Sequence, residues 1–311
     1  MKVAISGAGG FIGSALCDRF RGRGWDISRL TRVRPAADDA SQIYWNHETG
    51  EIEAAKLEGI DAVVHLAGKS LASGKWTPKS KEEFRRSRID GTLLVAKTLA
   101  GLADKPKVLV CASATGYYGP GNPLTSHQFL GEPLDESAPA GFGYLAELCR
   151  DWEAAAEPAR AAGIRVVNVR IGFVISPRGG TLRQMLLPFR LGLGGNFASG
   201  KQVMNLISLT DLVSIFAFAI ENDFMEGAIN GVCPAPLTNA QFTRAMSRVI
   251  RRPAFCHVPA FVLKAIAGEL AEFIIAGEPP VVSSRLAAAR FKFLCPDAEK
   301  ILEFEISGRI P

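Results

Sequence analysis

The chain has 311 residues, of which 48% are hydrophobic, and its formal net charge is +5. This length indicates about two domains, or one large α/β domain with an appendage, and the apolar fraction is ordinary for a globular protein. The positive charge is too small and too scattered to indicate a nucleic-acid partner, although it suits a protein that holds a phosphorylated cofactor.

The six cysteines are widely spaced and include no C-x-x-C pair. This pattern is typical of reduced thiols in a cytoplasmic protein rather than of a disulfide framework or a zinc site. The chain starts directly with a strand-like run, so we expect no signal peptide. The longest apolar run, around residues 212–220, is too short to cross a bilayer. We therefore expect a cytoplasmic protein without a metal site that binds a small molecule and contacts no membrane.

An apolar run over residues 2–6 leads into a glycine pattern and then into a helical pattern. The spacing is G-x-x-G-x-x-G, at Gly7, Gly10 and Gly13. In a strand–turn–helix unit the first glycine permits the turn, the second lets the backbone approach a pyrophosphate, and the third lets the helix pack closely. The free amides of the helix start, at Phe11 and Ile12, then face the anion. The alternative is a glycine turn that binds nothing, but this context favours a dinucleotide site.

A second strand is expected over residues 26–31. Its end lies roughly 20 residues beyond the glycine pattern, where a carboxylate normally binds the ribose 2′-hydroxyl of NAD. This sequence has Thr31 and Arg32 there instead, with Arg34 two residues further on. A guanidinium pairs with a 2′-phosphate and no acid repels one, so the pattern predicts NADP(H) rather than NAD. The alternative is that Arg32 is a solvated loop cation.

A third strand is expected over residues 43–45, and the near-continuous apolar run over residues 61–68 predicts a buried parallel strand. That run ends in Ala67 and Gly68, small residues that suit a strand end against which a cofactor lies. His65 lies within the strand and is expected to be a core residue rather than a catalytic one.

A long helix is expected over residues 79–103. Arg88 on this helix is either a surface cation or a side chain that reaches over the cofactor. Gly91 in the helix interior predicts a close neighbour, because glycine weakens a helix unless something packs against it.

The next strand is expected over residues 107–112, and it leads into the segment 113–119. A loop of about twenty residues rich in proline and glycine follows, and loops of that length are usually functional. The helix after it begins near Phe142 and carries Tyr144, Leu148 and Trp152 on one apolar face.

Further strands are expected over residues 164–171, 205–209 and 228–233, and further helices over residues 181–191 and 211–221. Strands that alternate with helices predict an α/β fold with a Rossmann-type, doubly wound parallel sheet.

The segment Pro234-Ala235-Pro236 indicates a domain boundary, after which Thr238 is expected to cap another helix. We therefore predict a dinucleotide-binding domain with substrate-side insertions over residues 1–236 and a small, mostly helical C-terminal lobe over residues 237–311.

Several motifs together resemble a known family. The glycine pattern, the strand over residues 61–68 and the segment 113–119 resemble an extended short-chain dehydrogenase/reductase. Further motifs look like the atypical "epimerase family protein" group, namely Arg170-Ile171-Gly172-Phe173-Val174, Gly179-Gly180, Met185-Leu186-Leu187-Pro188-Phe189, Gly192-Leu193-Gly194-Gly195 and Pro234-Ala235-Pro236-Leu237-Thr238-Asn239. The stretch from Gly277-Glu278-Pro279-Pro280 to Ala289-Arg290-Phe291-Lys292-Phe293 resembles the end of that group's small C-terminal domain.

This resemblance covers essentially the whole chain and implies a Rossmann fold with NADP(H) binding. It implies cofactor contacts at Thr31, Arg32, Leu66, Ala67, Glu83, Arg88 and Val174. Together with the glycine turn and the strand ends, the predicted cofactor site comprises Gly7, Gly10, Phe11, Ile12, Thr31, Arg32, Leu66, Ala67, Gly68, Glu83, Arg88, Ser113 and Val174.

The sequence departs from this family at the catalytic pair. Catalytic members use a Tyr-x-x-x-Lys pair, in which the lysine lowers the pKa of the phenol. The four tyrosines are not followed by lysine at that spacing, and no lysine occurs between Lys107 and Lys201. The usual serine position holds Ala114, with Ser113 before it and Thr115 after it. In addition, Leu206-Ile207-Ser208 replaces the Trp-Ile-His usual in the group.

Three functions are consistent with these residues. The first is an NADPH-dependent oxidoreductase, with Tyr144 as proton donor by position and Ser113 or Thr115 orienting a carbonyl, although Tyr144 also fits as a packing residue. The second is a protein that senses NADPH without chemistry, which accounts for the missing pair. The third is a nucleotide-sugar epimerase, which ranks last because that reaction needs a base at the hydride centre. The catalytic residues and the oligomeric state stay open.

Overall fold

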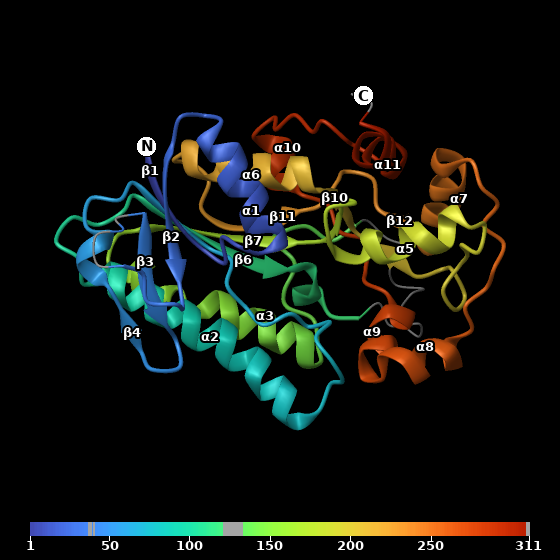
Figure 1. Ribbon diagram of the computed structural model, residues 1–311, viewed down its shortest axis with the longest axis horizontal. Coiled ribbons are helices and arrows are strands. Elements are labelled where there is room, and N and C mark those ends of the chain that lie inside the picture. The colour runs from blue at the N-terminus through green and yellow to red at the C-terminus, as the bar shows by residue number, and fades with distance from the viewer. Residues whose placement is uncertain (37–38, 40, 121–132, 309–311) are drawn as a thin grey trace.

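The computed structural model describes residues 1–36, 39, 41–120 and 133–308. Its centre is an eight-stranded sheet in the order β11-β7-β6-β5-β1-β2-β3-β4 (Figure 1). Neighbouring strands are parallel except for β4, which is antiparallel to β3. The strands of this sheet are β1 (Lys2–Ser6), β2 (Asp26–Thr31), β3 (Gln42–Asn46), β4 (Glu51–Ile52), β5 (Ala62–His65), β6 (Val108–Ala114), β7 (Arg165–Ile171) and β11 (Gly227–Gly231).

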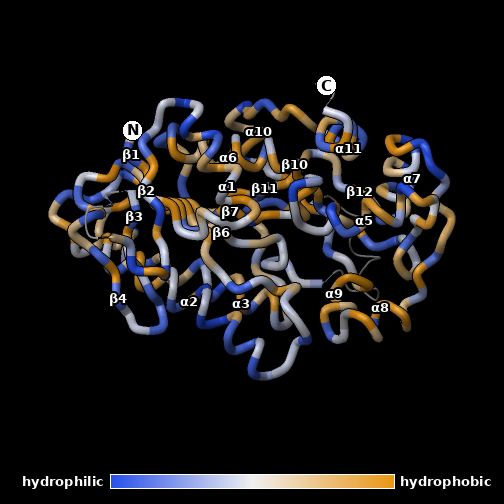
Figure 2. Tube along the Cα trace, in the orientation of Figure 1, coloured by the Kyte–Doolittle hydropathy of each residue, from blue (hydrophilic) through white to orange (hydrophobic). Residues whose placement is uncertain are grey.

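Helices cover both faces of the sheet, which confirms the predicted Rossmann-type architecture (Figure 1). One face carries α1 (Phe11–Arg21), α6 (Leu209–Glu221) and α10 (Ser284–Ala288). The other face carries α2 (Pro78–Ala100), α3 (Tyr144–Ala154) and α4 (Glu157–Ala161). Figure 2 shows the central strands mostly in the hydrophobic colour, as expected for a sheet that is buried on both sides.

The remaining elements gather beyond one end of the sheet (Figure 1). They are the short strands β8 (Phe173–Ile175), β9 (Val203–Met204), β10 (Leu206–Ser208) and β12 (Leu237–Thr238), and the helices α5 (Gly180–Arg190), α7 (Asn239–Ile250), α8 (Ala260–Ala267), α9 (Glu269–Ala276) and α11 (Ala298–Ser307). Two single turns of 3₁₀ helix complete the fold, η1 (Ala54–Leu57) and η2 (Thr115–Tyr118).

A shared hydrophobic core joins α5, α7 and α11 with the short strands β8, β9, β10 and β12. Met185 of α5, Phe242 of α7 and Ile301 of α11 are buried in one cluster. This cluster combines residues from both sides of Pro236, where we placed the domain boundary, and that boundary stays a prediction.

Several local predictions are confirmed in detail. Thr238 caps α7, and its side chain accepts a hydrogen bond from the Gln241 amide. Gly91 in α2 lies against the indole of Trp45, with 3.4 Å between that ring and the position of a Cβ.

The loop predicted after residue 119 falls largely on residues 121–132, outside the described residues. Within the described ranges, no helix combines the length and the apolar character needed to cross a bilayer.

The glycine pattern generates a test of the fold. A Cβ on Gly13 would lie 2.1 Å from the Gly7 carbonyl oxygen, so Gly13→Ala should lower the free energy of unfolding by about 1–3 kcal/mol, the usual cost of overpacking. Gly9→Ala is the matched control, because a Cβ there meets no atom within 4 Å, and we expect a change within about 0.5 kcal/mol. Urea unfolding of both variants measures the difference, and equal stabilities would contradict the close contact.

Candidate functional site

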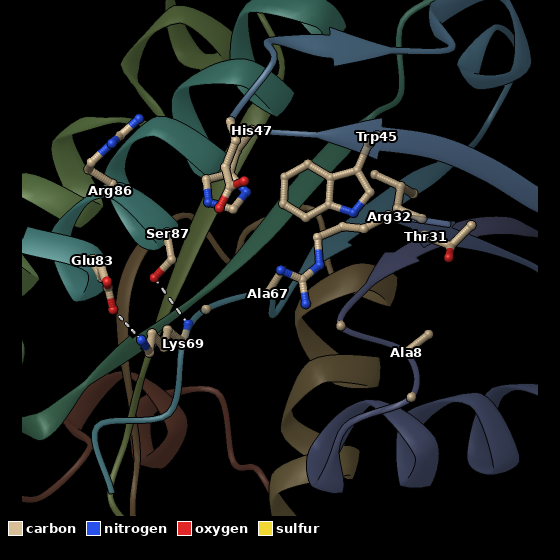
Figure 3. Close-up of a pocket in the computed structure, with 15 residues that line it drawn as sticks. Ala8, Thr31, Arg32, Trp45, His47, Ala67, Lys69, Glu83, Arg86 and Ser87 are labelled. Carbon is tan, nitrogen blue, oxygen red and sulfur yellow. Dashed lines mark hydrogen bonds and ion pairs between the residues drawn. The ribbon is translucent and has the colours of Figure 1, made fainter. Parts of the chain in front are cut away.

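A cleft of about 910 Å³ lies at the carboxyl ends of β1, β2 and β5. This edge is where doubly wound sheets bind their ligands. Figure 3 shows the side chains that line the cleft. The lining residues are Gly7, Ala8, Gly9, Leu30, Thr31, Arg32, Trp45, His47, Glu48, Ala67, Gly68, Lys69, Glu83, Arg86 and Ser87.

The floor of the cleft is the turn between β1 and α1. Gly7 has a φ of +68°, and a Cβ there would lie 3.1 Å from the backbone of Leu66 and Ala67, so the turn requires glycine. The Gly10 amide donates to the Gly7 carbonyl at 2.9 Å and closes the turn. No side chain caps α1, and its first turn contains no acidic residue. Free amides at this helix start are therefore available to an anion.

A buried hydrogen-bond cluster fixes the end of β5 beside this turn. The Ser6 hydroxyl accepts from the amides of Leu66 at 3.1 Å and Ala67 at 3.2 Å. Its own hydrogen is then free for Nδ1 of His65, 2.8 Å away. Burial lowers the pKa of His65 to about 4, so this ring is neutral near pH 7. His65 therefore acts as the buried core residue that the sequence predicts.

Arg32 extends into the cleft below the indole of Trp45 (Figure 3). Its guanidinium makes no hydrogen bond or ion pair with the described part of the chain. Arg34, two residues on, is engaged differently, because it pairs with Glu51 at 2.6 Å and stacks over Tyr44 at 4.2 Å. Of these two arginines, Arg32 is thus the one that lines the cleft.

The opposite wall comes from β3 and α2, and it includes the predicted Glu83 as well as Trp45, His47 and Arg86, which sequence reasoning did not place here. Trp45 and His47 belong to β3 and the residues after it, and Arg86 belongs to α2. Burial lowers the pKa of His47. Lys69 forms an ion pair with Glu83, and its amide donates to the Ser87 hydroxyl at 3.0 Å, which fixes the loop after β5 against α2 (Figure 3).

A second, smaller cavity of about 170 Å³ lies further along the same edge, at the carboxyl ends of β6 and β7. It is lined by Leu71, Arg88, Ala114, Thr115, Gly116, Leu145, Leu148, Cys149, Trp152, Ile171, Gly172, Phe173, Phe273 and Glu278. Two of these, Phe273 and Glu278, come from the C-terminal segment.

Arg88 lies between the cleft and this cavity. Its guanidinium lies 3.4 Å from the position of a Cβ on Gly68 and 5.1 Å from the ring centre of Trp152. Nη1 donates to the carbonyls of Lys69 at 2.9 Å and Phe84 at 3.3 Å. The side chain is buried, burial lowers its pKa, and none of the described carboxylates pairs with it. It is therefore no surface cation, and it lies at the boundary of the two spaces.

Glu278 is the acidic group of the cavity, and it is fully enclosed, with 5% of the residue exposed. Both carboxyl oxygens lie 2.9 Å from the Thr115 hydroxyl, and one accepts from Nδ2 of Asn205 at 2.9 Å. Burial raises the pKa of this carboxyl. Sequence reasoning missed Glu278 as a site residue, although it lies in the Gly277–Pro280 motif that carries part of the family resemblance.

The predicted cofactor residues fall into three groups. The cleft is lined by Gly7, Thr31, Arg32, Ala67, Gly68 and Glu83. The cavity is lined by Arg88. Neither space is lined by Gly10, Phe11, Ile12, Leu66, Ser113 or Val174.

Ser113 does not line the cavity, and its hydroxyl is hydrogen-bonded to a side chain of α3. Its hydroxyl donates to Glu153 at 2.7 Å. Glu153 in turn accepts two hydrogen bonds from the guanidinium of Arg170, at 2.8 and 2.9 Å. This buried ion pair links α3 to β7, and the hydroxyl of Ser113 is engaged by the same carboxylate.

No Tyr–Lys pair is found at the cavity in the described residues. Tyr144 has Leu148 four residues on, and its hydroxyl donates to the Lys81 carbonyl at 2.8 Å. This contact favours the packing role for Tyr144. Tyr118 does lie beside a cation, since it accepts from Nη1 of Arg170 at 2.9 Å, but it does not line the cavity.

The departure at Leu206-Ile207-Ser208 lies away from both spaces. These residues form β10, which pairs with β8 and is fully buried. Ser208 caps α6, where its side chain accepts from the Asp211 amide. The substitution therefore changes the core of the fold rather than the lining of the cleft or cavity.

The comparisons with known proteins agree with this geometry. The model of the NAD dependent epimerase/dehydratase family matches residues 3–230, and a domain of unknown function, DUF1731, matches residues 258–305. Epimerase family protein Mb2239 of Mycobacterium bovis is 40% identical over 294 residues, which are 94% of this chain and 93% of that protein.

Two solved structures show how far the likeness extends. The human epimerase family protein SDR39U1, solved with NADPH, is 32% identical with a TM-score of 0.88, covering 99% of this chain and all of that one. A UDP-glucose 4-epimerase of Thermotoga maritima has a TM-score of 0.76 at 15% identity, covering 99% of this chain and 98% of its own, and shares the fold. On these findings, the chain belongs to the NAD dependent epimerase/dehydratase family and carries the C-terminal DUF1731 domain.

Proposed function

We propose that this protein binds NADPH and uses it to reduce a small carbonyl substrate. The observation that carries the proposal is the cleft that the Gly7–Gly9 turn and Arg32 both line, directly before the uncapped start of α1. The turn leaves no room for a Cβ at Gly7, as expected for the first glycine of a dinucleotide-binding turn. Membership of the family supports a nicotinamide dinucleotide, and the NADPH held by the human relative supports the phosphorylated form.

The choice of NADPH over NADH rests on the end of β2. Arg32 follows Thr31 there, and both line the cleft. A guanidinium forms charge-assisted hydrogen bonds with a phosphate. The carboxylate Glu48 also lines the cleft, but it follows β3 and is exposed, so it does not replace the acid that NAD-binding folds carry after β2.

The other residues that would hold the cofactor follow from the position of the two spaces. The amides at the start of α1 face the pyrophosphate, and Ala67 and Gly68 offer a flat strand end beside it. Arg88 lies where the cleft meets the cavity at β6 and β7. When bound, the reduced dinucleotide supplies a hydride. The 170 Å³ cavity then limits the reacting part of the substrate to a small group.

A sensor of NADPH is the second candidate, favoured by a specific observation. Tyr144 is hydrogen-bonded to the Lys81 carbonyl, and Leu148 stands where a catalytic lysine would lie. Burial raises the pKa of Tyr144, and the nearby cations Arg88 and Arg85 oppose this rise without reversing it. A nucleotide-sugar epimerase ranks third, because that reaction needs a base at the hydride centre, and the likeness to the UDP-glucose 4-epimerase at 15% identity extends to the fold alone.

We also propose a cytoplasmic location. All six cysteines are free thiols, and five of them are buried, as is usual for a protein kept under reducing conditions. The partner that we propose is a small molecule, rather than a nucleic acid or a membrane.

Cofactor choice is tested by titrating NADPH and NADH. Arg32→Ala should weaken NADPH binding by about 10- to 100-fold, because a hydrogen bond to a charged group contributes about 1.5–3 kcal/mol, and it should leave NADH binding nearly unchanged. Arg34→Ala is the matched control, since Arg34 is engaged by Glu51 and Tyr44. Equal affinity of the unmutated protein for both cofactors would refute the NADPH assignment.

Single-turnover measurements distinguish an enzyme from a sensor. The protein is loaded with NADPH and mixed with a panel of small aldehydes and ketones, and nicotinamide absorbance is followed. We expect at least one carbonyl compound to oxidise the bound cofactor. A ligand that binds and shifts the protein's thermal stability without any oxidation of NADPH, across the whole panel, would instead support the sensor.

A further inference from the structure

We propose that Glu278, supplied by the C-terminal domain, is the acid that protonates the carbonyl oxygen of the substrate. The proposal rests on the proposed reductase function and assigns a chemical role to the domain of unknown function. Glu278 lines the 170 Å³ cavity together with Thr115 and Gly116, the residues that follow β6. Ala114, which ends β6 and also lines this cavity, holds the position of the serine usual in this family.

The segment that carries Glu278 is held firmly against the rest of the fold. Gly277 has a φ of +69°, and a Cβ there would lie 2.6 Å from the side chain of Gln202. The amide of Val281 donates to Oδ1 of Asn205 at 3.0 Å, and the Leu134 amide donates to the Pro280 carbonyl at 2.9 Å. The carboxyl therefore reaches the cavity from a fixed backbone.

The hydrogen bonds around Glu278 can also be satisfied when the carboxyl is neutral. Because Val281 fixes Oδ1 of Asn205, the amide nitrogen of that residue must face the carboxyl, and it donates one bond. The Thr115 hydroxyl has one hydrogen and cannot donate to both carboxyl oxygens at once. If the acid is protonated, its O–H donates to Thr115, whose hydrogen can turn to the Ile171 carbonyl at 3.4 Å.

The charge environment of Glu278 also favours the protonated form. Burial is the main cause that raises its pKa, and the bonds from Asn205 and Thr115 oppose it. The other titratable side chains of the cavity are Arg88 from α2 and Cys149 from α3. Neither forms an ion pair with Glu278 in the described structure, and the thiol, with a pKa of about 12, is neutral near pH 7.

The other candidate donors are less suited to the reaction. The Tyr144 hydroxyl is used by the Lys81 carbonyl. The Tyr118 hydroxyl accepts from Arg170 and has its single hydrogen directed at Asn230 or at the Asp135 carbonyl, at 2.8 and 3.0 Å. Burial raises the pKa of Tyr118 despite the neighbouring cation. Glu278 is thus the proton donor that lines the cavity and whose pKa is raised from its ordinary value toward neutral pH.

The proton balance of the reduction is simple. The carbonyl carbon gains the hydride that NADPH provides, and the carbonyl oxygen gains the proton of Glu278. The O–H bond of the carboxylic acid breaks as the O–H bond of the product alcohol forms, and Glu278 is left as a carboxylate. Thr115 and Asn205 stabilise that carboxylate by donating to it, and water restores its proton after the alcohol leaves.

The test compares Glu278→Gln with Glu305→Gln as a matched control. Glu305 is also a partly enclosed carboxyl with a pKa raised by burial, but it lies on α11 and lines neither the cleft nor the cavity. The first readout is independent of activity. The infrared carbonyl band of a protonated carboxyl is recorded near neutral pH for the native protein and both variants, and we expect Glu278→Gln to remove a band that Glu305→Gln retains.

The second readout is the single-turnover rate with the carbonyl compound that oxidises bound NADPH. Glu278→Gln should lower this rate by about 10²- to 10⁴-fold, the usual contribution of an acid–base group, whereas Glu305→Gln should not. NADPH affinity should be unchanged in both. The native rate should fall as pH rises through the raised pKa of Glu278, because the carboxylate has no proton to give.

Contrary results separate the two proposals. Unchanged turnover in Glu278→Gln, or an infrared spectrum that shows Glu278 ionised at neutral pH, overturns the role of Glu278 and leaves the reductase function in place. Tight NADPH binding without turnover of any carbonyl compound by the native protein overturns the reductase function, and this role for Glu278 with it.

Discussion

The close backbone contact between the turn after β1 and the end of β5 is the constraint on which the site depends. Gly7 adopts a φ of +68° and leaves no space for a side chain against Leu66 and Ala67. The Ser6 hydroxyl then binds the amides of those two residues and so fixes the separation of the strands. This contact sets the start of α1 and the loop after β5 on opposite sides of one cleft, where an anion can meet both.

The cleft and the cavity differ from the rest of the interior in whether a buried charge has a partner of opposite charge. Arg170 and Glu153 form a buried, doubly hydrogen-bonded ion pair, so each charge is compensated within the fold. Arg88 is equally enclosed but is met by backbone carbonyls alone. An arginine cannot lose its proton to reduce this cost, whereas a glutamate such as Glu278 can gain one. The cavity is therefore lined by a fixed cation and by an acid that can become neutral.

Local chemistry determined which parts of this arrangement could be predicted. The strand–turn–helix unit and the position of Arg32 after β2 depend on neighbouring residues, and the structure places them as the sequence predicts. For Arg88 the sequence left two alternatives, since a long helix does not itself show which face meets the sheet. Trp45 and Arg86 reach the cleft only because β3 and α2 are brought together by the fold. The amino-acid pattern around Trp45 or Arg86 does not predict that the side chain lines the cleft.

Glu278 could not be found from local patterns for a related reason. It lies 163 residues from Thr115, the residue that it contacts, and an acid followed by two prolines is typical of a solvated loop. Its enclosure depends on two distant conditions, the close approach of Gly277 to Gln202 and the amide of Asn205 that faces the carboxyl. Neither condition involves residues adjacent in the chain.

The origin of the cavity wall explains why fold likeness alone says little about the reaction. Phe273 and Glu278 reach the cavity from the C-terminal domain, while Thr115 and Gly172 come from the dinucleotide-binding sheet. The sheet is shared with sugar-nucleotide epimerases at 15% identity, whereas the wall that Phe273 and Glu278 supply is built by a domain matched by its own family model. The chemistry at this site thus depends both on the shared sheet and on the C-terminal segment that completes the cavity wall. Likeness of the sheet alone therefore says nothing about the residues that the C-terminal segment supplies.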